Sequence, residues 1–279
     1  MRVCFTSDLH GTPVLYDQLD ALLDHERPAL LILGGDLCID AQQNDPKGTQ
    51  AAFVESDLVP RLKRWRRAHP ALRVAAIPGN HEWVCTWDIL AAHARRGLLE
   101  LLNLQTPLVL NGLSILGYGC TPPTPFWAKD FERLDLSSDD PGNFDGLCWD
   151  AATQKPKPCR AREFFPSQRS MEDDFALVRP PPDPWVLVAH APPYGTQLDR
   201  LPHVAGPVGS RAVRAFVERS APCLSLHGHI HESPSLTGGW RERVGRTLCV
   251  NPGQEDARLH AVVFSSEDPV GTLRHNLFP

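Results

Sequence analysis

The chain begins with MRVCFTSDLH at positions 1 to 10, and this stretch sets the pattern for the fold. The run from Arg2 to Thr6 is mostly apolar and short, which predicts a buried strand. Asp8 and His10 follow directly. Residues two apart in an extended segment project to the same side, so a carboxylate and an imidazole can reach one metal ion. We therefore expect a strand that delivers two metal-binding side chains at its carboxyl end.

Short apolar runs of the same kind recur along the chain and alternate with segments that have helical spacing. The expected strands are Ala29 to Leu33, Arg73 to Ile77, Trp185 to Ala189 and Cys223 to Leu226. The expected helices are Val14 to Asp24, Gln50 to Ala68, Trp87 to Arg95 and Gly209 to Arg219, the last with Ser210 as its N-cap. Strands and helices in alternation predict an α/β fold.

The second half of the chain adds a hairpin and several late strands. Leu108 to Leu110, the Asn111-Gly112 turn and Leu113 to Leu116 have the pattern of a β-hairpin. Further short strands are expected around Leu248 to Val250, Ala261 to Phe264 and Thr272 to Leu277.

One segment differs from the rest in composition. Residues 121–184 are rich in Pro, Asp and aromatic residues, and only Arg169 to Arg179 has a helical pattern. A loop this long inside a compact domain is usually a lid or a binding loop. We expect residues 1–279 to form one domain that carries this Pro-rich insert.

Composition narrows the classes of function. The 279 residues are 42% hydrophobic and 22% charged, as in ordinary globular enzymes, and the formal net charge of -5 provides no basic field for nucleic acid. No apolar stretch is long enough to span a bilayer. The eight cysteines include no C-x-x-C pair, and no signal-peptide core follows Met1. These features favour a cytoplasmic protein with reduced cysteines.

Five segments place metal-binding side chains directly after expected strands. They are Asp8-Leu-His10, Gly34-Gly-Asp36, Gly79-Asn-His-Glu82, His190 before Ala-Pro-Pro, and Gly228-His-Ile-His231. Each segment alone is a weak signal. In open α/β sheets, however, the ligand crevice lies outside the carboxyl ends of the strands, so five such segments would converge. Their oxygen and nitrogen donors suit divalent metals.

In this order, D-x-H, G-D, G-N-H-E, H-x-P-P and G-H-x-H resemble the signature of the calcineurin-like metallophosphoesterase superfamily, from Asp8 to His231. The resemblance implies a two-sheet β-sandwich flanked by helices, with metals at the carboxyl edge of the strands. It implies one divalent ion held by Asp8, His10, Asp36 and His231, and a second held by Asp36, Asn80, His190 and His229. Asp36 would bridge the two ions, and His81 would be the catalytic residue that contacts the substrate phosphate or the leaving group. One departure is Asp40, which lies one position later than the second acid of the frequent G-D-x-x-D pattern.

The runs Gly79 to Glu82, His190 to Thr196 and Gly228 to Glu232 are similar to those of small phosphoesterases related to the fetal-brain metallophosphoesterase-domain proteins. This similarity implies hydrolysis of a phosphodiester, including cyclic-nucleotide-like substrates, or of a phosphomonoester, by a hydroxide that bridges the two metals. The implied cofactors are two divalent ions per chain. Manganese is the first expectation, with iron, zinc or nickel as alternatives.

Other interpretations stay open at this point. The chain could be a nuclease that acts on single-stranded nucleic acid, or a non-catalytic scaffold of the same fold. We expect a small phosphate ester as substrate and no membrane partner, while the insert could bind a protein partner. His227 could support the metal site or have a purely structural role. Some side chains could bind substrate or simply pack and form surface: Phe126, Trp127, Trp149, Arg160, Arg162 and Tyr194.

Overall fold

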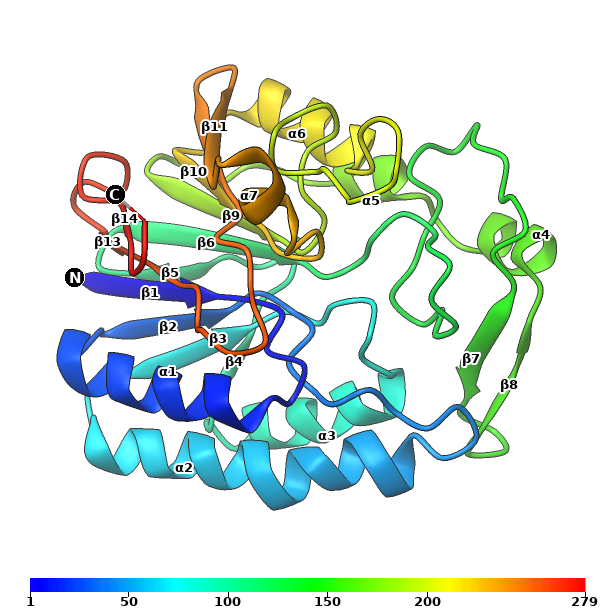
Figure 1. Ribbon diagram of the computed structural model, residues 1–279, viewed down its shortest axis with the longest axis horizontal. Helices are drawn as coiled ribbons and strands as arrows, with labels where there is room; N and C mark the ends of the chain where they lie inside the picture. Colours follow the sequence, from blue (N-terminus) through cyan, green and yellow to red (C-terminus); the bar gives the residue numbers. More distant parts are fainter. Residues whose placement is uncertain (279) are drawn as a thin grey trace.

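The computed structural model describes residues 1–278 and contains two six-stranded sheets stacked face to face, with helices on their outer sides (Figure 1). A separate two-stranded sheet lies in the insert, at the end of the molecule opposite to the chain termini. The predicted α/β sandwich flanked by helices is therefore confirmed.

The first sheet has the strand order β14-β13-β1-β2-β3-β4. Strands β1 to β4 are parallel, and β13 pairs with β1 in the antiparallel sense. The bounds are β1 Arg2–Thr6, β2 Leu30–Leu33, β3 Arg73–Ala76, β4 Glu100–Leu101, β13 Val262–Ser265 and β14 Arg274–His275.

The second sheet has the order β11-β12-β10-β9-β6-β5. Its four central strands are parallel, and each of the two edge strands is antiparallel to its neighbour. The bounds are β5 Leu108–Leu110, β6 Leu113–Tyr118, β9 Trp185–Ala189, β10 Leu224–Leu226, β11 Arg241–Val244 and β12 Thr247–Val250.

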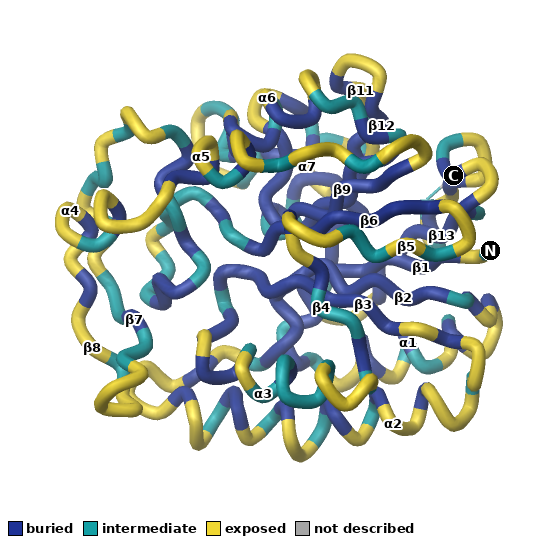
Figure 2. The backbone as a smooth tube through the Cα atoms, turned by 180° about the vertical axis from the view of Figure 1, so that it is seen from behind, coloured by how far each residue is buried: buried dark blue, intermediate teal, exposed yellow. Residues whose placement is uncertain are grey.

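The main core lies between the two sheets, and each outer face is covered by helices. Phe5 and Ile32 of the first sheet pack in one cluster with Val186, Val188 and Leu226 of the second. Helices α1, α2 and α3 cover the outer face of the first sheet, and α5 and α6 cover that of the second. Because both faces of the central strands are covered, these strands are mostly apolar and are buried along nearly all of their length, apart from the exposed Arg2 and Arg73 at the starts of β1 and β3 (Figure 2).

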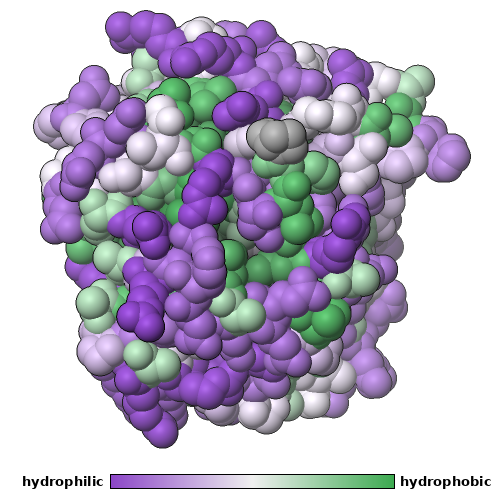
Figure 3. All heavy atoms as spheres, turned by 60° about the vertical axis from the view of Figure 1, so that its left-hand side comes forward, coloured by the Kyte–Doolittle hydropathy of each residue, from purple (hydrophilic) through white to green (hydrophobic). Residues whose placement is uncertain are grey.

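The helices are α1 Pro13–Glu26, α2 Val59–Ala68, α3 Val84–Ala94, α4 Ala161–Phe164, α5 Met171–Ala176, α6 Arg211–Ser220 and α7 Ser233–Thr237. Short turns of wider or tighter helix occur at η1 Lys47–Ala51, η2 Val54–Leu58 and η3 Phe165–Ser167. Within residues 1–278, no helix has the length and apolar character needed to cross a membrane. The surface at the end that carries the termini is largely hydrophilic, with small apolar patches between the polar groups (Figure 3).

Most predicted strands agree with the structure to within a residue or two. The sequence pattern did not predict strands β4 and β11 or helices α4 and α7, and two further regions differ. The segment Gln50 to Ala68 is regular α-helix only from Val59, because Pro60 lacks the N–H that a longer helix would need there. In the insert, strands β7 (Gly146–Asp150) and β8 (Lys155–Cys159) form a hairpin that the sequence pattern did not predict. The two prolines of β8 obscure the strand pattern, yet they are tolerated because the strand is an edge strand.

A buried ion pair anchors the first part of the insert. Lys129 and Glu132 are both fully buried, and Lys129 Nζ lies 2.9 Å from Glu132 Oε2. The same ammonium group donates to the carbonyl oxygens of Thr124, at 2.7 Å, and Phe126. Glu132 in turn accepts hydrogen bonds from the backbone N–H and the hydroxyl of Thr124. Residues 124–126 are therefore held at both backbone and side-chain atoms.

We expect Lys129→Met to lower the free energy of unfolding by about 3–5 kcal/mol, because it leaves the Glu132 carboxylate buried without its cation. Urea unfolding followed by tryptophan fluorescence measures this change. The surface pair of Arg162 and Asp140, with both side chains more than 60% exposed, provides the matched control. Arg162→Met should lower the free energy of unfolding by less than about 1 kcal/mol. Equal decreases for the two variants would contradict the anchoring role.

Candidate metal centre

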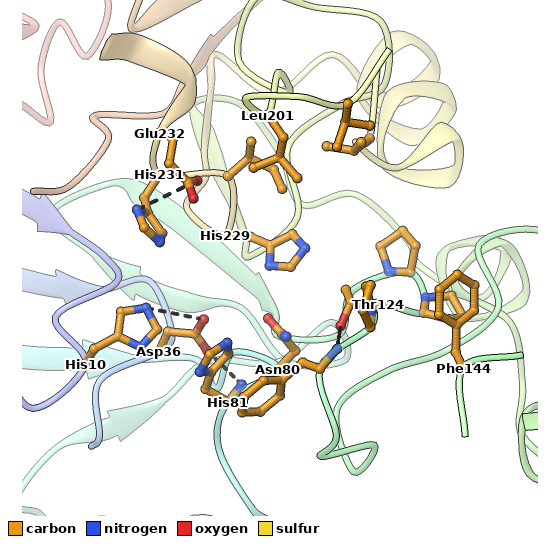
Figure 4. A pocket seen from close by; sticks show the side chains of 17 residues that line it. His10, Asp36, Asn80, His81, Thr124, Phe144, Leu201, His229, His231 and Glu232 are labelled. Carbon is orange, nitrogen blue, oxygen red and sulfur yellow. Dashed lines mark hydrogen bonds and ion pairs between the residues drawn. The ribbon is translucent and has the colours of Figure 1, made fainter. Parts of the chain in front are cut away.

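The carboxyl ends of β1, β2, β3, β9 and β10 meet at one edge of the sandwich, where the five sequence segments converge. Asp8 and His190 are buried below a pocket, whereas the other predicted side chains line it. Figure 4 shows His10, Asp36, Asn80 and His81 on one side of the pocket and His229 and His231 on the other. The structure thus brings together all eight residues that the sequence predicted.

Four of these residues have a left-handed backbone conformation. The φ angles are 57° for Asp8, 44° for His10, 51° for Asp36 and 65° for His229. Such conformations cost about 1–3 kcal/mol each in non-glycine residues and cluster at functional sites. The cost is offset partly by bonds between the loops, since His10 N–H donates to the Asp36 carbonyl at 2.9 Å.

Two glycines allow close approach between the loops. A Cβ atom at Gly79 would lie 2.1 Å from Asp36 Oδ1, and one at Gly228 would lie 2.4 Å from Asp8 Oδ2. Any side chain at either position would displace a predicted ligand atom. The glycines of the G-N-H-E and G-H-x-H segments therefore allow the loops of the site to pack closely against the predicted ligands.

The candidate ligand atoms form three groups, of which two share Asp36 and the third consists of His10, Asp40 and His81. Asp8, His10 and Asp36 each place one ligand atom within 4.8 Å of the others, and so do Asp36, His190 and His229. The Asp36 Oδ2 atom lies 3.2 Å from His190 Nε2 and 3.9 Å from His10 Nε2. Each of these two groups contains three of the four residues in one of the ligand sets that the resemblance implies.

Asn80 and His231 stand beside these groups. The buried Oδ1 atom of Asn80 has no hydrogen-bond partner among the described residues. The His231 ring centroid lies 5.7 Å from that of His10, and its Nδ1 atom lies 3.8 Å from a carboxylate oxygen of Glu232. His231 therefore lies near the first group without belonging to it.

The donor set fits divalent ions. Besides Asn80 Oδ1, the buried atoms Asp8 Oδ2 and His190 Nε2 also lack hydrogen-bond partners in residues 1–278. Buried polar atoms are rarely left in this state, because desolvation without a partner costs about 1–3 kcal/mol each. The Nδ1 N–H of His190 donates to the Gly34 carbonyl at 2.8 Å, so the Nε2 lone pair is free to coordinate. Two cations, one at the donor group of Asp8 and one at that of His190, would together satisfy the three orphaned atoms.

The electrostatics favour a positive charge among these side chains. Burial lowers the pKa of His229 to about 3, which keeps its imidazole neutral and able to act as a ligand. Burial also acts to lower the pKa of His190, but the carboxylates of Asp36 and Asp8 outweigh it and raise this pKa to about 9. The carboxylates that attract a proton here would equally attract a metal ion.

His81 is positioned by two neighbours. Its Nδ1 atom lies 2.7 Å from Asp40 Oδ1, and its ring stacks on Phe126 with centroids 3.7 Å apart and planes 13° from parallel. Burial opposes the charged imidazole, but the Asp36 and Asp40 carboxylates prevail and raise the His81 pKa to about 9. The late spacing of Asp40 was noted from the sequence, but its contact with His81 was not foreseen.

Glu82 has a role that sequence reasoning missed. Its fully buried carboxylate accepts hydrogen bonds from the backbone N–H groups of Asp36 and Gly79, and of Leu37 and Cys38. It thereby ties the loop that carries Asp36 to the loop that carries Asn80. The only sequence signal was its place in the G-N-H-E segment.

Two further residues hold the backbone around the histidine ligands. The Nδ1 N–H of His227 donates to the carbonyls of Ala189 and Ala191, which flank His190. The Asn251 side chain donates to the Ile230 carbonyl at 2.9 Å, between the two predicted histidine ligands.

The other candidate side chains have different positions. Phe126 lines the pocket, whereas Trp127 and Trp149 pack on Trp83. Arg162 pairs with Asp140 at the surface, and neither it nor Arg160 lines the pocket.

Comparisons with known proteins agree with the fold. One solved structure aligns over 100% of this chain and 99% of its own, with a TM-score of 0.62 and 16% identity. The structure of protein TT1561 from Thermus thermophilus aligns over 99% of this chain and 97% of its own, with a TM-score of 0.57 and 15% identity. These identities establish a shared fold only. No curated protein sequence gives a significant match.

The profile of one protein family, described as calcineurin-like phosphoesterase, matches residues 1–233. These residues include both donor groups and every predicted site residue. Because the match spans well over half of the sequence, the chain belongs to the calcineurin-like phosphoesterase family.

Proposed function

We propose that the protein is a metal-dependent phosphoesterase that binds two divalent ions, with manganese as the first expectation, and hydrolyses phosphodiesters or phosphomonoesters. The observation that carries this proposal is the pair of donor groups that share Asp36. Two ions held by these residues would polarise the phosphoryl oxygens and lower the pKa of bound water. The first ion would be held by Asp8, His10, Asp36 and His231, and the second by Asp36, Asn80, His190 and His229.

His81 would supply the proton that the reaction needs. With Nδ1 bonded to Asp40, the protonated ring carries its second N–H at Nε2. His81 lines the pocket, where this N–H can donate to a phosphate oxygen or to the departing oxygen. The raised pKa keeps His81 protonated near neutral pH. Stacking on Phe126 limits rotation of the ring and so maintains this geometry.

The two rival functions have less support. A nuclease for single strands usually combines a basic groove with aromatic side chains that stack on successive bases. None of the described residues that line the pocket is Lys or Arg. A non-catalytic scaffold has no need for strained donor residues, orphaned ligand atoms and an oriented His81 in one place.

We expect Asp36→Asn to lose metal and activity together, because Asp36 belongs to both donor groups. Elemental analysis of manganese-loaded protein should show that the metal content falls from about two ions per chain to fewer than one. Turnover of bis-p-nitrophenyl phosphate should fall at least about 100-fold, because mutation of a residue that only orients a metal ligand already lowers metal affinity or activity about 10- to 100-fold.

Two variants serve as controls for this test. Asp17→Asn, at an exposed carboxylate paired with Arg61, should change neither readout. His81→Ala should keep the metal while turnover falls about 100- to 10,000-fold, the range expected for a general acid. Full metal content and full activity in Asp36→Asn would disprove the metal assignment.

We expect Asp40→Asn to lower the pKa of His81 from about 9 towards its ordinary value of about 6.5. The sign follows because a neighbouring carboxylate stabilises the imidazolium, and the amide does not. NMR titration of the His81 ring in chelated protein measures the shift directly, with Asp17→Asn as the control. In the metal-loaded enzyme, the basic limb of the pH–rate profile should move to lower pH. An unchanged His81 titration would show that the Asp40 contact does not set this pKa.

A further inference from the structure

The pocket above the metal centre has a volume of about 500 Å³, which is within the usual range for small-molecule sites. Its floor is formed by the predicted ligands and His81. Its walls come from two segments far apart in sequence, the start of the insert and the loop before α6, and they are predominantly apolar. The apolar wall residues used in this argument are Pro123, Phe126, Phe144, Leu201, Val204 and Val208.

The charged side chains that line the pocket lie at its floor and rim. Among the described lining residues the acidic ones are Asp36 and Glu232, and Lys and Arg are absent. The neighbouring Arg200 is outside the lining, where its Nε atom donates to the Thr196 carbonyl and lies 3.8 Å from Asp199. Proteins bind additional phosphates through Lys, Arg or helix N-termini. A second phosphate in this pocket would meet apolar groups and the Glu232 carboxylate instead.

The apolar walls are formed before a ligand arrives. On one side, the buried Lys129 ammonium holds the carbonyls of Thr124 and Phe126. On the other, the Val208 N–H donates to the carbonyl of Asp199 at 3.1 Å. Figure 4 shows Leu201 beside His229 and Glu232, and Phe144 on the far side of the pocket from His10. A preformed wall binds an apolar group without the entropic cost of ordering the protein.

We propose, on the basis of the phosphoesterase function proposed above, that the substrates are esters with a single phosphate whose organic group is apolar and about the size of one or two rings. The metal centre would bind the phosphate, and the walls would bury the organic group. Substrates that carry a second phosphate, or another negatively charged organic group, would be excluded by the absence of a cation along the walls.

A matched set of diesters tests this specificity in the manganese-loaded protein. Methyl, 1-naphthyl and 2-phosphonoethyl p-nitrophenyl phosphates share one leaving group and differ only in the second organic group. The kcat/KM for the naphthyl ester should exceed that for the methyl ester by about tenfold or more, since apolar pockets discriminate at this level for small apolar groups. The phosphonoethyl ester should be the poorest of the three.

Substitutions in the walls should change these ratios in opposite directions. Phe144→Ala should lower the naphthyl-to-methyl ratio by about tenfold, because it removes apolar contact. Leu201→Arg should raise hydrolysis of the phosphonoethyl ester relative to the naphthyl ester, because it supplies the missing cation. The control is Leu177→Ala, at a leucine that is exposed and lies outside the pocket lining, and all ratios should stay as in the unmodified protein.

The outcomes separate this inference from the proposed function. Equal kcat/KM values for the three esters, unaffected by both wall variants, would overturn the substrate class and leave the phosphoesterase activity established. Preference for the phosphonoethyl ester in the unmodified protein would also overturn it. Absence of turnover with every ester in protein that binds two manganese ions would overturn the proposed function, and this inference with it.

Discussion

The geometry of the metal centre depends on the buried carboxylate of Glu82. Four backbone N–H groups from two loops donate to it, and hydrogen bonds to a charged group are worth about 1.5–3 kcal/mol each. Burial and the nearby Asp36 raise the Glu82 pKa to about 7, while the N–H groups act in the opposite direction. The loop after β2 is thus fixed to the loop after β3, which places Asp36 next to Asn80. Without a common anchor, the shared ligand and its neighbour would move independently.

The site also contains several strained features that the surrounding structure must hold in place. Four donor residues have left-handed backbone conformations, and three donor atoms lack hydrogen-bond partners in the described chain. Each feature is unfavourable for the protein alone, and the parallel strands that end here supply the rigid platform that maintains them. Because bound cations would satisfy the orphaned atoms, part of the free energy of the proposed metal binding would also stabilise the fold. On this proposal, the site would be most stable with both ions bound.

The sequence predicted the parts of the molecule that depend on local pattern. Strands such as Trp185–Ala189 are continuous apolar runs because both of their faces are buried, and this signal needs no tertiary information. The donor residues could be found because they directly follow such strands. The contacts of Asp40 and Glu82 could not be found in this way, because each contact joins two loops that are about 40 residues apart in the sequence. The β7–β8 hairpin was also missed, because Pro156 and Pro158 conceal a strand that pairs on one edge only.

On the proposed function, the residues that bind the phosphate are separate from those that bind its organic group. The strand ends of the sandwich would supply the charged donors and His81, whose effect would be exerted on groups that change charge during the reaction. The insert and the loop before α6 supply apolar walls, whose contacts are the same in the ground state and in the transition state and therefore act mainly on binding. Phe126 belongs to both parts, since it lines the pocket and stacks on His81. The buried Lys129, which fixes the Phe126 carbonyl, thereby couples the insert to the orientation of His81, for which we propose the role of proton donor.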